Sequence, residues 1–184
     1  MKVGIISDTH GGVSSWKASL EVFNEVDMII HAGDVFYHGP RNLFPEEYDP
    51  ASLAQSMNKL EIPLLISRGN CDADVDQLVL DFPLLAPYLI FDAGLVRIFV
   101  HHGHMFDEEE VLKYARKLRV KLVISGHTHI PSIEKKENIL FFNPGSPSLP
   151  KGKEGPTVGL LEGESLRLLS LPEGRVLKEV KVLA

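Results

Sequence analysis

The chain has 184 residues and a formal net charge of −6; 44% of its residues are hydrophobic and 24% are charged. This composition is typical of a globular protein and excludes a disordered chain, a collagen and a coiled coil. The length predicts a single domain that spans residues 1–184. The negative charge argues against tight binding to duplex nucleic acid, because such binding depends on clustered Lys and Arg side chains.

Cysteine content and apolar runs indicate the cellular setting. Cys71 is the only cysteine, so neither an intramolecular disulfide nor a thiolate zinc site is expected. The apolar run at the amino terminus is short and ends at Asp8, unlike a signal peptide. Charged residues and prolines interrupt the most apolar region, residues 78–100, so no membrane span is expected. These features predict a cytoplasmic protein.

Short β-branched runs alternate with helical apolar spacing through the first 130 residues. Strands at 3–7 and 28–31, joined by a helix that ends near residue 24, form a β-α-β unit whose strands pair in parallel. From residue 132 onward the pattern changes to hairpins. The other expected strands are 63–67, 88–91, 96–101, 122–125, 132–134, 140–142, 157–162, 165–171 and 176–182.

Three helices are expected between the strands. Ser14 and Ser15 are candidate caps of the first, and the second covers residues 51–60 after a loop at 36–50. Asp107 caps the third, whose acidic first turn suits the positive end of the helix dipole. This order of elements predicts an α/β fold with two mixed sheets flanked by helices, a four-layer α-β-β-α sandwich.

Polar side chains with metal-binding chemistry follow five of these strands. Loops at the carboxyl ends of strands converge in α/β folds, so residues far apart in sequence can meet there. Two carboxylates, one amide oxygen and four imidazoles suit Mn, Fe, Ni, Co or Zn rather than Ca. The candidate ligands are Asp8, His10, Asp34, Asn70, His102, His127 and His129.

Seven ligands are too many for one tetrahedral ion. A carboxylate that bridges two ions roughly 3.5–4 Å apart would divide them into two sets with room for water and substrate. The pattern therefore predicts a dinuclear hydrolase in which a metal-bound hydroxide attacks phosphorus. Each fragment alone is weak evidence, and the hypothesis depends on their joint occurrence at successive strand ends.

The order of these motifs resembles the calcineurin-like metallophosphoesterase superfamily. The motifs are Asp8-Thr9-His10, Gly33-Asp34, Gly69-Asn70, His102-Gly103-His104 and Gly126-His127-Thr128-His129. The segments Gly69-Asn70-Cys71-Asp72, Asn143-Pro144-Gly145-Ser146 and 36–42 are similar to its small YfcE-type phosphodiesterase branch. The resemblance gives the second of these segments a structural role near the site.

The resemblance also implies an activity and a metal assignment. One ion takes Asp8, His10, Asp34 and His129, the other takes Asp34, Asn70, His102 and His127, and Asp34 bridges them. The implied cofactors are two divalent ions, Mn²⁺ first, with Ni²⁺, Co²⁺, Fe²⁺ and Zn²⁺ as alternatives. The implied substrate is a small phosphodiester, which makes the chain a metal-dependent phosphodiesterase.

The chain departs from the superfamily at Cys71, where most catalytic members have a histidine that assists leaving-group protonation. The acid that would orient this histidine is Asp72. A thiol with a pKa near 8.5 replaces an imidazole poorly, and loss of a general acid costs roughly 10² to 10⁴ in rate. The alternative is that Cys71 is a small packing residue. The catalytic candidates are Asp34, Asn70, Cys71, Asp72 and His104, which could replace the missing acid.

The remaining histidines and Arg41 have weaker signals, and the fold also allows a second function. His38 and Arg41 follow Asp34 in a loop and could contact substrate phosphate, whereas His31 and His101 are expected to pack within strands. The alternative function is a protein-interaction scaffold that resembles the retromer scaffold subunit. An exposed sheet edge or the loop at 36–50 could mediate a homodimer or homotetramer.

Overall fold

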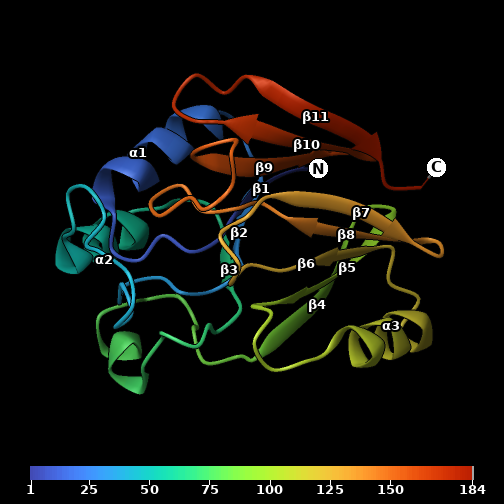
Figure 1. Cartoon of the computed structure of the whole chain (residues 1–184), viewed down its shortest axis with the longest axis horizontal. Coiled ribbons are helices and arrows are strands. Elements are labelled where there is room, and N and C mark those ends of the chain that lie inside the picture. The colour runs from blue at the N-terminus through green and yellow to red at the C-terminus, as the bar shows by residue number, and fades with distance from the viewer. Residues whose placement is uncertain (184) are drawn as a thin grey trace.

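The computed structural model describes residues 1–183, in which two β-sheets lie face to face (Figure 1). The strands are β1 (Lys2–Ile6), β2 (Met28–His31), β3 (Leu64–Ile66), β4 (Tyr88–Ala93), β5 (Val96–His101), β6 (Leu122–Ile124), β7 (Ser132–Lys136), β8 (Ile139–Asn143), β9 (Thr157–Glu162), β10 (Ser165–Ser170) and β11 (Val176–Lys181). The helices are α1 (Val13–Val22), α2 (Pro50–Asn58) and α3 (Glu108–Lys117), with a 3₁₀ helix η1 (Asp74–Leu78).

Each sheet mixes parallel and antiparallel strands. The six-stranded sheet has the order β11-β10-β9-β1-β2-β3, and the five-stranded sheet has the order β4-β5-β6-β8-β7. The strands β1, β2 and β3 pair in parallel, as do β5, β6 and β8, while hairpin strands complete both sheets. Ile5 lies opposite Ile30, so the predicted β-α-β unit is confirmed. The carboxyl ends of the parallel strands therefore lie along one edge of each sheet.

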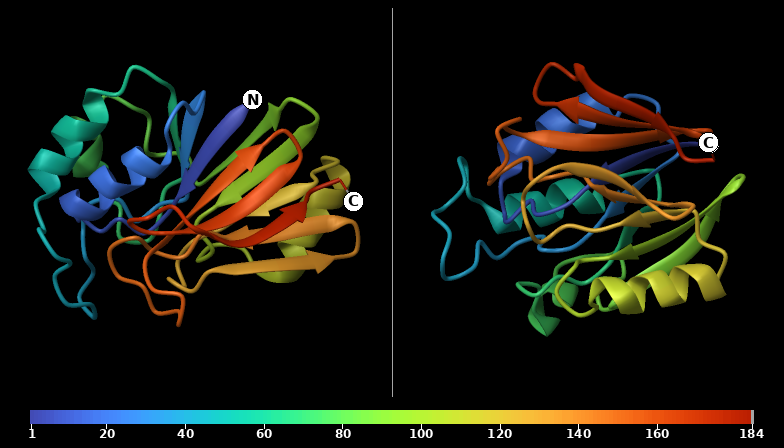
Figure 2. Two further views of the ribbon diagram at one scale, coloured as in Figure 1. Left: turned by 90° about the horizontal axis from the view of Figure 1, so that it is seen from above. Right: turned by 45° about the vertical axis from the view of Figure 1, so that its right-hand side comes forward.

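Three apolar cores separate four layers, which confirms the predicted α-β-β-α sandwich (Figure 2). Trp16 of α1 packs in the same core as Ile29, so α1 and α2 cover the outer face of the six-stranded sheet. Ile30 and Val100 belong to the core between the two sheets. Val111 of α3 packs in a third core on the outer face of the five-stranded sheet. Burial of each such side chain stabilises the fold by about 1.5–3 kcal/mol relative to exposure.

The predicted cap of α3 is correct, and the predicted caps of α1 are wrong. Asp107 caps α3 as predicted, because its carboxylate accepts from the Glu110 N–H while the Glu110 side chain accepts from the Asp107 N–H. The predicted caps of α1 are wrong, since that helix begins after Gly12 and no side chain caps it. Ser15 lies inside α1, where its hydroxyl donates to the Gly12 carbonyl at 3.0 Å.

The element limits otherwise differ from the predictions mainly by one to three residues, and η1 was not predicted. The loop at 36–50 contains no strand or helix before α2 begins at Pro50. Among residues 1–183, no helix has the length and apolar character that a membrane crossing requires.

Candidate metal centre

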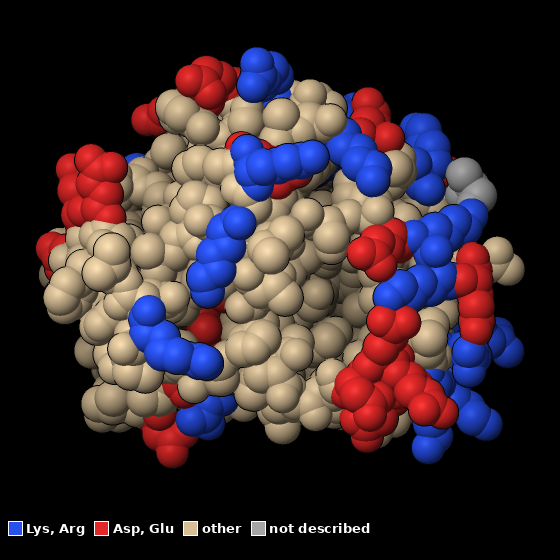
Figure 3. Space-filling model, in the orientation of Figure 1, with Lys and Arg blue, Asp and Glu red and all other residues tan. Residues whose placement is uncertain are grey.

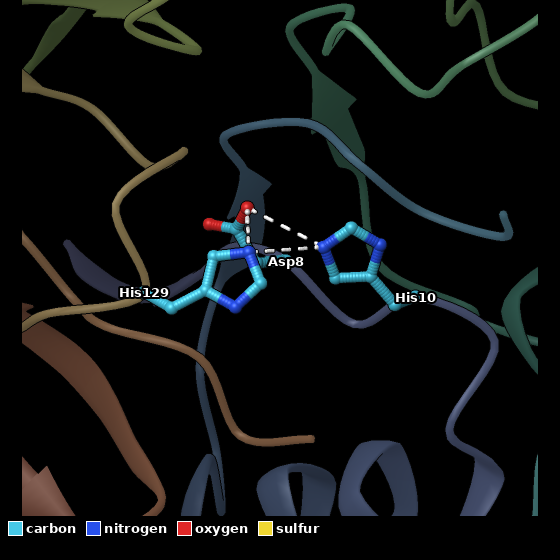
Figure 4. Close-up of side chains that lie close together, drawn as sticks. All are labelled: Asp8, His10 and His129. Carbon is cyan, nitrogen blue, oxygen red and sulfur yellow. Dashed lines mark hydrogen bonds and ion pairs between the residues drawn. The ribbon is translucent and has the colours of Figure 1, made fainter. Parts of the chain in front are cut away.

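The loops after β1 and β6 bring the side chains of Asp8, His10 and His129 to one point (Figure 4). The Nε2 atoms of His10 and His129 lie 3.2 Å apart. Both face the same carboxylate oxygen, Asp8 Oδ1, at 3.7 Å and 3.4 Å respectively. All three residues are at most 3% exposed, so little water competes for these polar atoms.

The loops after β2, β3 and β5 add a second group beside the first. His102 Nε2 lies 3.3 Å from Asp34 Oδ2 and 3.1 Å from Asn70 Oδ1. The same Asp34 oxygen lies 3.7 Å from His10 Nε2. One carboxylate oxygen therefore faces imidazoles of both groups.

Backbone carbonyl groups fix the three buried imidazoles. The Nδ1 atoms of His10, His102 and His129 lie 2.6–2.7 Å from the carbonyl oxygens of Tyr37, Ala32 and Leu149. A carbonyl oxygen only accepts, so each Nδ1 carries a proton, and each ring presents an Nε2 lone pair to the site once any proton on Nε2 is lost. Metal-binding histidines commonly have this type of partner on the other ring nitrogen.

These atoms fit a metal ion. When both rings are neutral with the proton on Nδ1, the Nε2 atoms of His10 and His129 cannot hydrogen-bond to each other, and their lone pairs repel across 3.2 Å. A cation bound to both would remove that repulsion. Two nitrogens that each bind one ion at about 2.1 Å can be at most about 4.2 Å apart, a limit that this pair satisfies.

The backbone at the site is strained. Asp8, His10, Asp34, His127 and His129 have φ values of 56°, 45°, 59°, 70° and 60°. This left-handed region costs a non-glycine residue roughly 1–2 kcal/mol. Strained backbone conformations are frequent at functional sites, where packing and hydrogen bonds of the surrounding structure maintain them.

Two glycines allow the loops to approach closely. A Cβ atom on Gly126 would lie 2.6 Å from Asp8 Oδ2, and one on Gly69 would lie 2.9 Å from Asp34 Cγ. Neither distance leaves room for a methyl group. The glycines of two predicted motifs therefore position the carboxylates at the site.

Burial disfavours the charged form of each ionisable group in the site. For Asp8, Asp34, His10 and His102, the attraction between opposite charges outweighs this effect. Burial alone would raise the pKa of Asp8 and Asp34, but neighbouring imidazoles, His10 for the first and His102 for the second, hold both below the usual range. Burial would lower the pKa of His102, yet the Asp34 carboxylate raises it to about 9. The pKa of His10 is raised against the effect of burial by Asp8. A bound cation would have to displace these protons.

Cys71 and Asp72 have different surroundings. Burial and then the Asp34 charge raise the pKa of the Cys71 thiol to about 12, so this thiol stays protonated and is a weak acid. Asp72 is 3% exposed, and its carboxylate accepts from the N–H groups of Asp34, Val35 and Gly69 at 2.7–2.9 Å. Asp72 thus ties the loop after β2 to the loop after β3.

His127 and His104 lie at the edge of the site. The His127 N–H donates to Asp8 Oδ2 at 3.0 Å, while its exposed ring lies 5.2 Å from the His102 ring between centroids. The exposed His104 ring lies 5.4 Å from that of His102. Burial lowers the pKa of both groups, and the charge of His102 lowers it further. These two rings do not join the tight group around Asp8 and Asp34.

The Asn143–Ser146 segment supports the site from behind. The Ser146 hydroxyl donates to the Asp8 carbonyl at 2.7 Å. The Asn143 amide donates to the Gly126 carbonyl, also at 2.7 Å. These contacts are consistent with the structural role implied for this segment.

The site opens into a cavity of about 470 Å³, whose lining includes Asp34, Arg41, Cys71, His129 and Lys151. Arg41 was a predicted substrate contact, whereas Lys151 was not singled out from the sequence. A lysine in a turn carries no distinctive signal, and its position follows only from the fold.

The remaining histidines lie away from this cavity. His38 does not line it and packs among the rings of Tyr37, Phe44 and Tyr48. His31 is fully buried: its Nδ1 accepts from the Gly33 N–H, and its Nε2 lies 2.9 Å from the Thr9 hydroxyl. His101 is 6% exposed and stacks on a phenylalanine ring. The strand-packing prediction for the last two is confirmed.

Comparisons with known proteins agree with this geometry. The model of the calcineurin-like phosphoesterase superfamily domain matches residues 1–165. The chain is 35% identical to phosphodiesterase YfcE of Escherichia coli strain K12 over 184 residues, which covers 99% of this chain and 98% of that protein.

Solved structures give the same result. The structure of YfcE, a phosphoesterase from E. coli, matches with a TM-score of 0.88 at 34% identity and covers 99% of this chain and 100% of that chain. Vps29 of Entamoeba histolytica in complex with Zn²⁺ matches with a TM-score of 0.68 at 20% identity over 99% of each chain, which shows the fold alone. The chain therefore belongs to the calcineurin-like phosphoesterase superfamily.

Proposed function

We propose that this chain is a metal-dependent phosphodiesterase that acts on small phosphodiesters. The observation that carries the proposal is the position of Asp34 Oδ2, which faces His102 at 3.3 Å and His10 at 3.7 Å. An oxygen placed between two groups of ligands is suited to bridge two ions. The similarity to YfcE, a protein named as a phosphodiesterase, supports the same activity.

The proposed ligand sets share Asp34. One set is Asp8, His10, Asp34 and His129, and the other is Asp34, Asn70, His102 and His127. Divalent ions at these positions, Mn²⁺ in the first instance, would lower the pKa of a water so that hydroxide attacks phosphorus at neutral pH. Nitrogen and oxygen donors bind several divalent ions, so the metal that is available in the cell also decides which ion occupies the site.

The chain's own residues position these groups and exclude water. Backbone carbonyls orient the imidazoles, and Asp72 holds together the loops that carry Asp34 and Asn70. Cys71 lies beside the Asp34 carboxylate and retains its proton, because burial raises its pKa to about 12. We propose that it donates poorly to a leaving group, with His104 as the other candidate acid.

A chelation and add-back assay with bis(p-nitrophenyl) phosphate tests the activity. Metal-stripped protein should be inactive, and Mn²⁺ should restore turnover. Asp34→Asn should lose at least about 10²-fold in kcat/KM, because it removes the shared charge. Asp81→Asn, at an exposed position, is the matched control. Full activity of the stripped protein, or of Asp34→Asn, would contradict the proposal.

The alternative is a protein-interaction scaffold of the same fold. Cys71, where most catalytic members of the superfamily have histidine, is the observation that favours it. A scaffold has no need of buried imidazoles held with their lone pairs converging, so the geometry favours the enzyme. Absence of turnover with every phosphodiester and metal tested would favour the scaffold.

The same proposal extends to the setting of the protein. We propose that residues 1–184 act as one domain, that the protein is cytoplasmic, and that it does not bind duplex nucleic acid tightly. We also propose a homodimer or homotetramer, because Leu43 and Phe44 in the loop at 36–50 are 86% and 66% exposed. Light scattering after gel filtration measures that state.

A further inference from the structure

Two basic residues line the cavity from different loops. Arg41 belongs to the loop after β2, and Lys151 follows the segment that supports His129. Figure 3 shows separate Lys and Arg side chains left of the centre of that view on mostly uncharged surface, with acidic side chains along its left edge. At the right of the same view, basic and acidic side chains are intermixed.

The backbone fixes both residues near the candidate ligands. The Lys151 N–H donates to the His129 carbonyl at 3.0 Å. Gly39 lies against Cys71, since a Cβ atom at Gly39 would be 3.3 Å from the Cys71 Sγ. Arg41 is two residues further along this loop. The two cations therefore flank the cavity.

Neither cation is neutralised by the protein. Within residues 1–183, the guanidinium of Arg41 and the ammonium of Lys151 have no ion-pair or hydrogen-bond partner. Both residues are exposed. In a chain of net charge −6, two unpaired cations beside one cavity favour an anionic occupant.

The reacting phosphodiester does not need these cations. It carries one negative charge, which the excess positive charge of two divalent ions would offset if Asp8 and Asp34 held them as proposed. Among the described residues that line the cavity there is no Phe, Tyr or Trp, so a nucleobase has no aromatic ring to stack on. Amide and hydroxyl groups of Asn42 and Thr128 occupy the lining instead.

We propose that Arg41 and Lys151 form a second anion subsite, which selects phosphodiesters whose retained alcohol carries a further phosphate. This inference rests on the proposed function and adds a substrate class to it. A guanidinium and an ammonium that both reach a terminal phosphate in this cavity would each donate charge-assisted hydrogen bonds to it.

A matched pair of substrates tests the subsite. The substrates are two phosphodiesters, p-nitrophenyl 3-(phosphonooxy)propyl phosphate and p-nitrophenyl 3-hydroxypropyl phosphate. They share the p-nitrophenolate leaving group and differ by one terminal phosphate. The Mn²⁺-loaded enzyme should favour the first by about tenfold in kcat/KM, and the ratio should fall as salt rises from 50 to 500 mM. Calorimetry should show the same preference for propane-1,3-diyl bisphosphate over 3-hydroxypropyl phosphate.

Variants connect the preference to the two residues. Arg41→Gln and Lys151→Gln should each reduce the ratio about threefold, and the double variant should bring it near one. Lys153→Gln is the control, because it removes an exposed charge two residues along the chain from Lys151, and the Lys153 side chain does not line the cavity. Lys151→Arg should retain the ratio, which separates loss of charge from loss of fold.

The outcomes distinguish this inference from the proposed function. Turnover of bis(p-nitrophenyl) phosphate with a substrate ratio near one would overturn the subsite and leave the phosphodiesterase intact. A high ratio that persists in the double variant would also overturn it. Absence of turnover with all diesters would overturn the proposed function itself.

Discussion

Replacement of Gly126 by alanine tests how closely the loops must approach. The added methyl group would lie 2.6 Å from Asp8 Oδ2 and 2.9 Å from Ser7 Cβ. An ordinary contact is at least about 3.4 Å, so the carboxylate must withdraw by about 0.8 Å. The Ser7 hydroxyl, which donates to that oxygen at 2.6 Å, must also turn away. A shift of this size at Asp8 Oδ1 would separate it from His10 and His129.

The expected result is a selective loss of metal binding. Overpacking costs about 1–3 kcal/mol in free energy of unfolding, and misplacement by nearly 1 Å costs about 10² in kcat/KM. Gly163→Ala is the control, because its φ of 59° makes alanine costly but no atom lies within 4 Å. Thermal unfolding, Mn²⁺ titration and turnover of bis(p-nitrophenyl) phosphate measure the three effects. Equal metal affinity in the two variants would refute the reasoning.

Three further predictions concern Cys71, His31 and nucleic acid. Cys71→His should raise hydrolysis of alkyl esters by up to about 10² to 10⁴ while p-nitrophenyl esters change little, and an unchanged leaving-group dependence in a fully metallated variant would make Cys71 a packing residue. Burial lowers the pKa of His31 from 6.5 to about 3, so between these values the unfolded chain binds the extra proton and stability falls as pH falls. Urea unfolding should therefore show that the free energy of unfolding falls less between pH 7 and pH 5 in His31→Gln than in the parent protein, by at most about 1.4 kcal/mol per pH unit. Equal losses in the two proteins would contradict the assignment. Fluorescence anisotropy with arbitrary duplex DNA at 150 mM salt should give a Kd weaker than about 1 µM, and tighter binding would contradict the charge argument.

The sequence was sufficient for the layers and for most of the residues that meet, although the ring of His127, a predicted ligand, lies outside the tight group. Short β-branched runs located the parallel strands, and their carboxyl ends carried Asp8, Asp34 and His102. Asp8 and Asp34 follow strands of one sheet and His102 follows a strand of the facing sheet, and the loops at the carboxyl ends of such strands are where binding residues converge. The distances from Asp34 Oδ2 to His10 and His102 agree with that inference.

Other features depend on the folded backbone. The φ of 59° at Asp34 has no local signal, since residues other than glycine rarely adopt this conformation. Lys151 reaches the cavity only because its N–H pairs with the His129 carbonyl. Ser14 and Ser15 are good caps by type, but the chain turns into α1 at Gly12, two residues earlier than the pattern indicates.

Counting bound metal tests the central claim most directly. Purified protein reconstituted with Mn²⁺ and freed of excess ion should contain two ions per chain by elemental mass spectrometry. Asn70→Ala should retain one, because the Asn70 amide oxygen lies beside His102, at 3.1 Å from its Nε2. Asp34→Ala should retain less than one, since the shared carboxylate also offsets repulsion between the cations. The same metal content in all three proteins would contradict a dinuclear site bridged by Asp34.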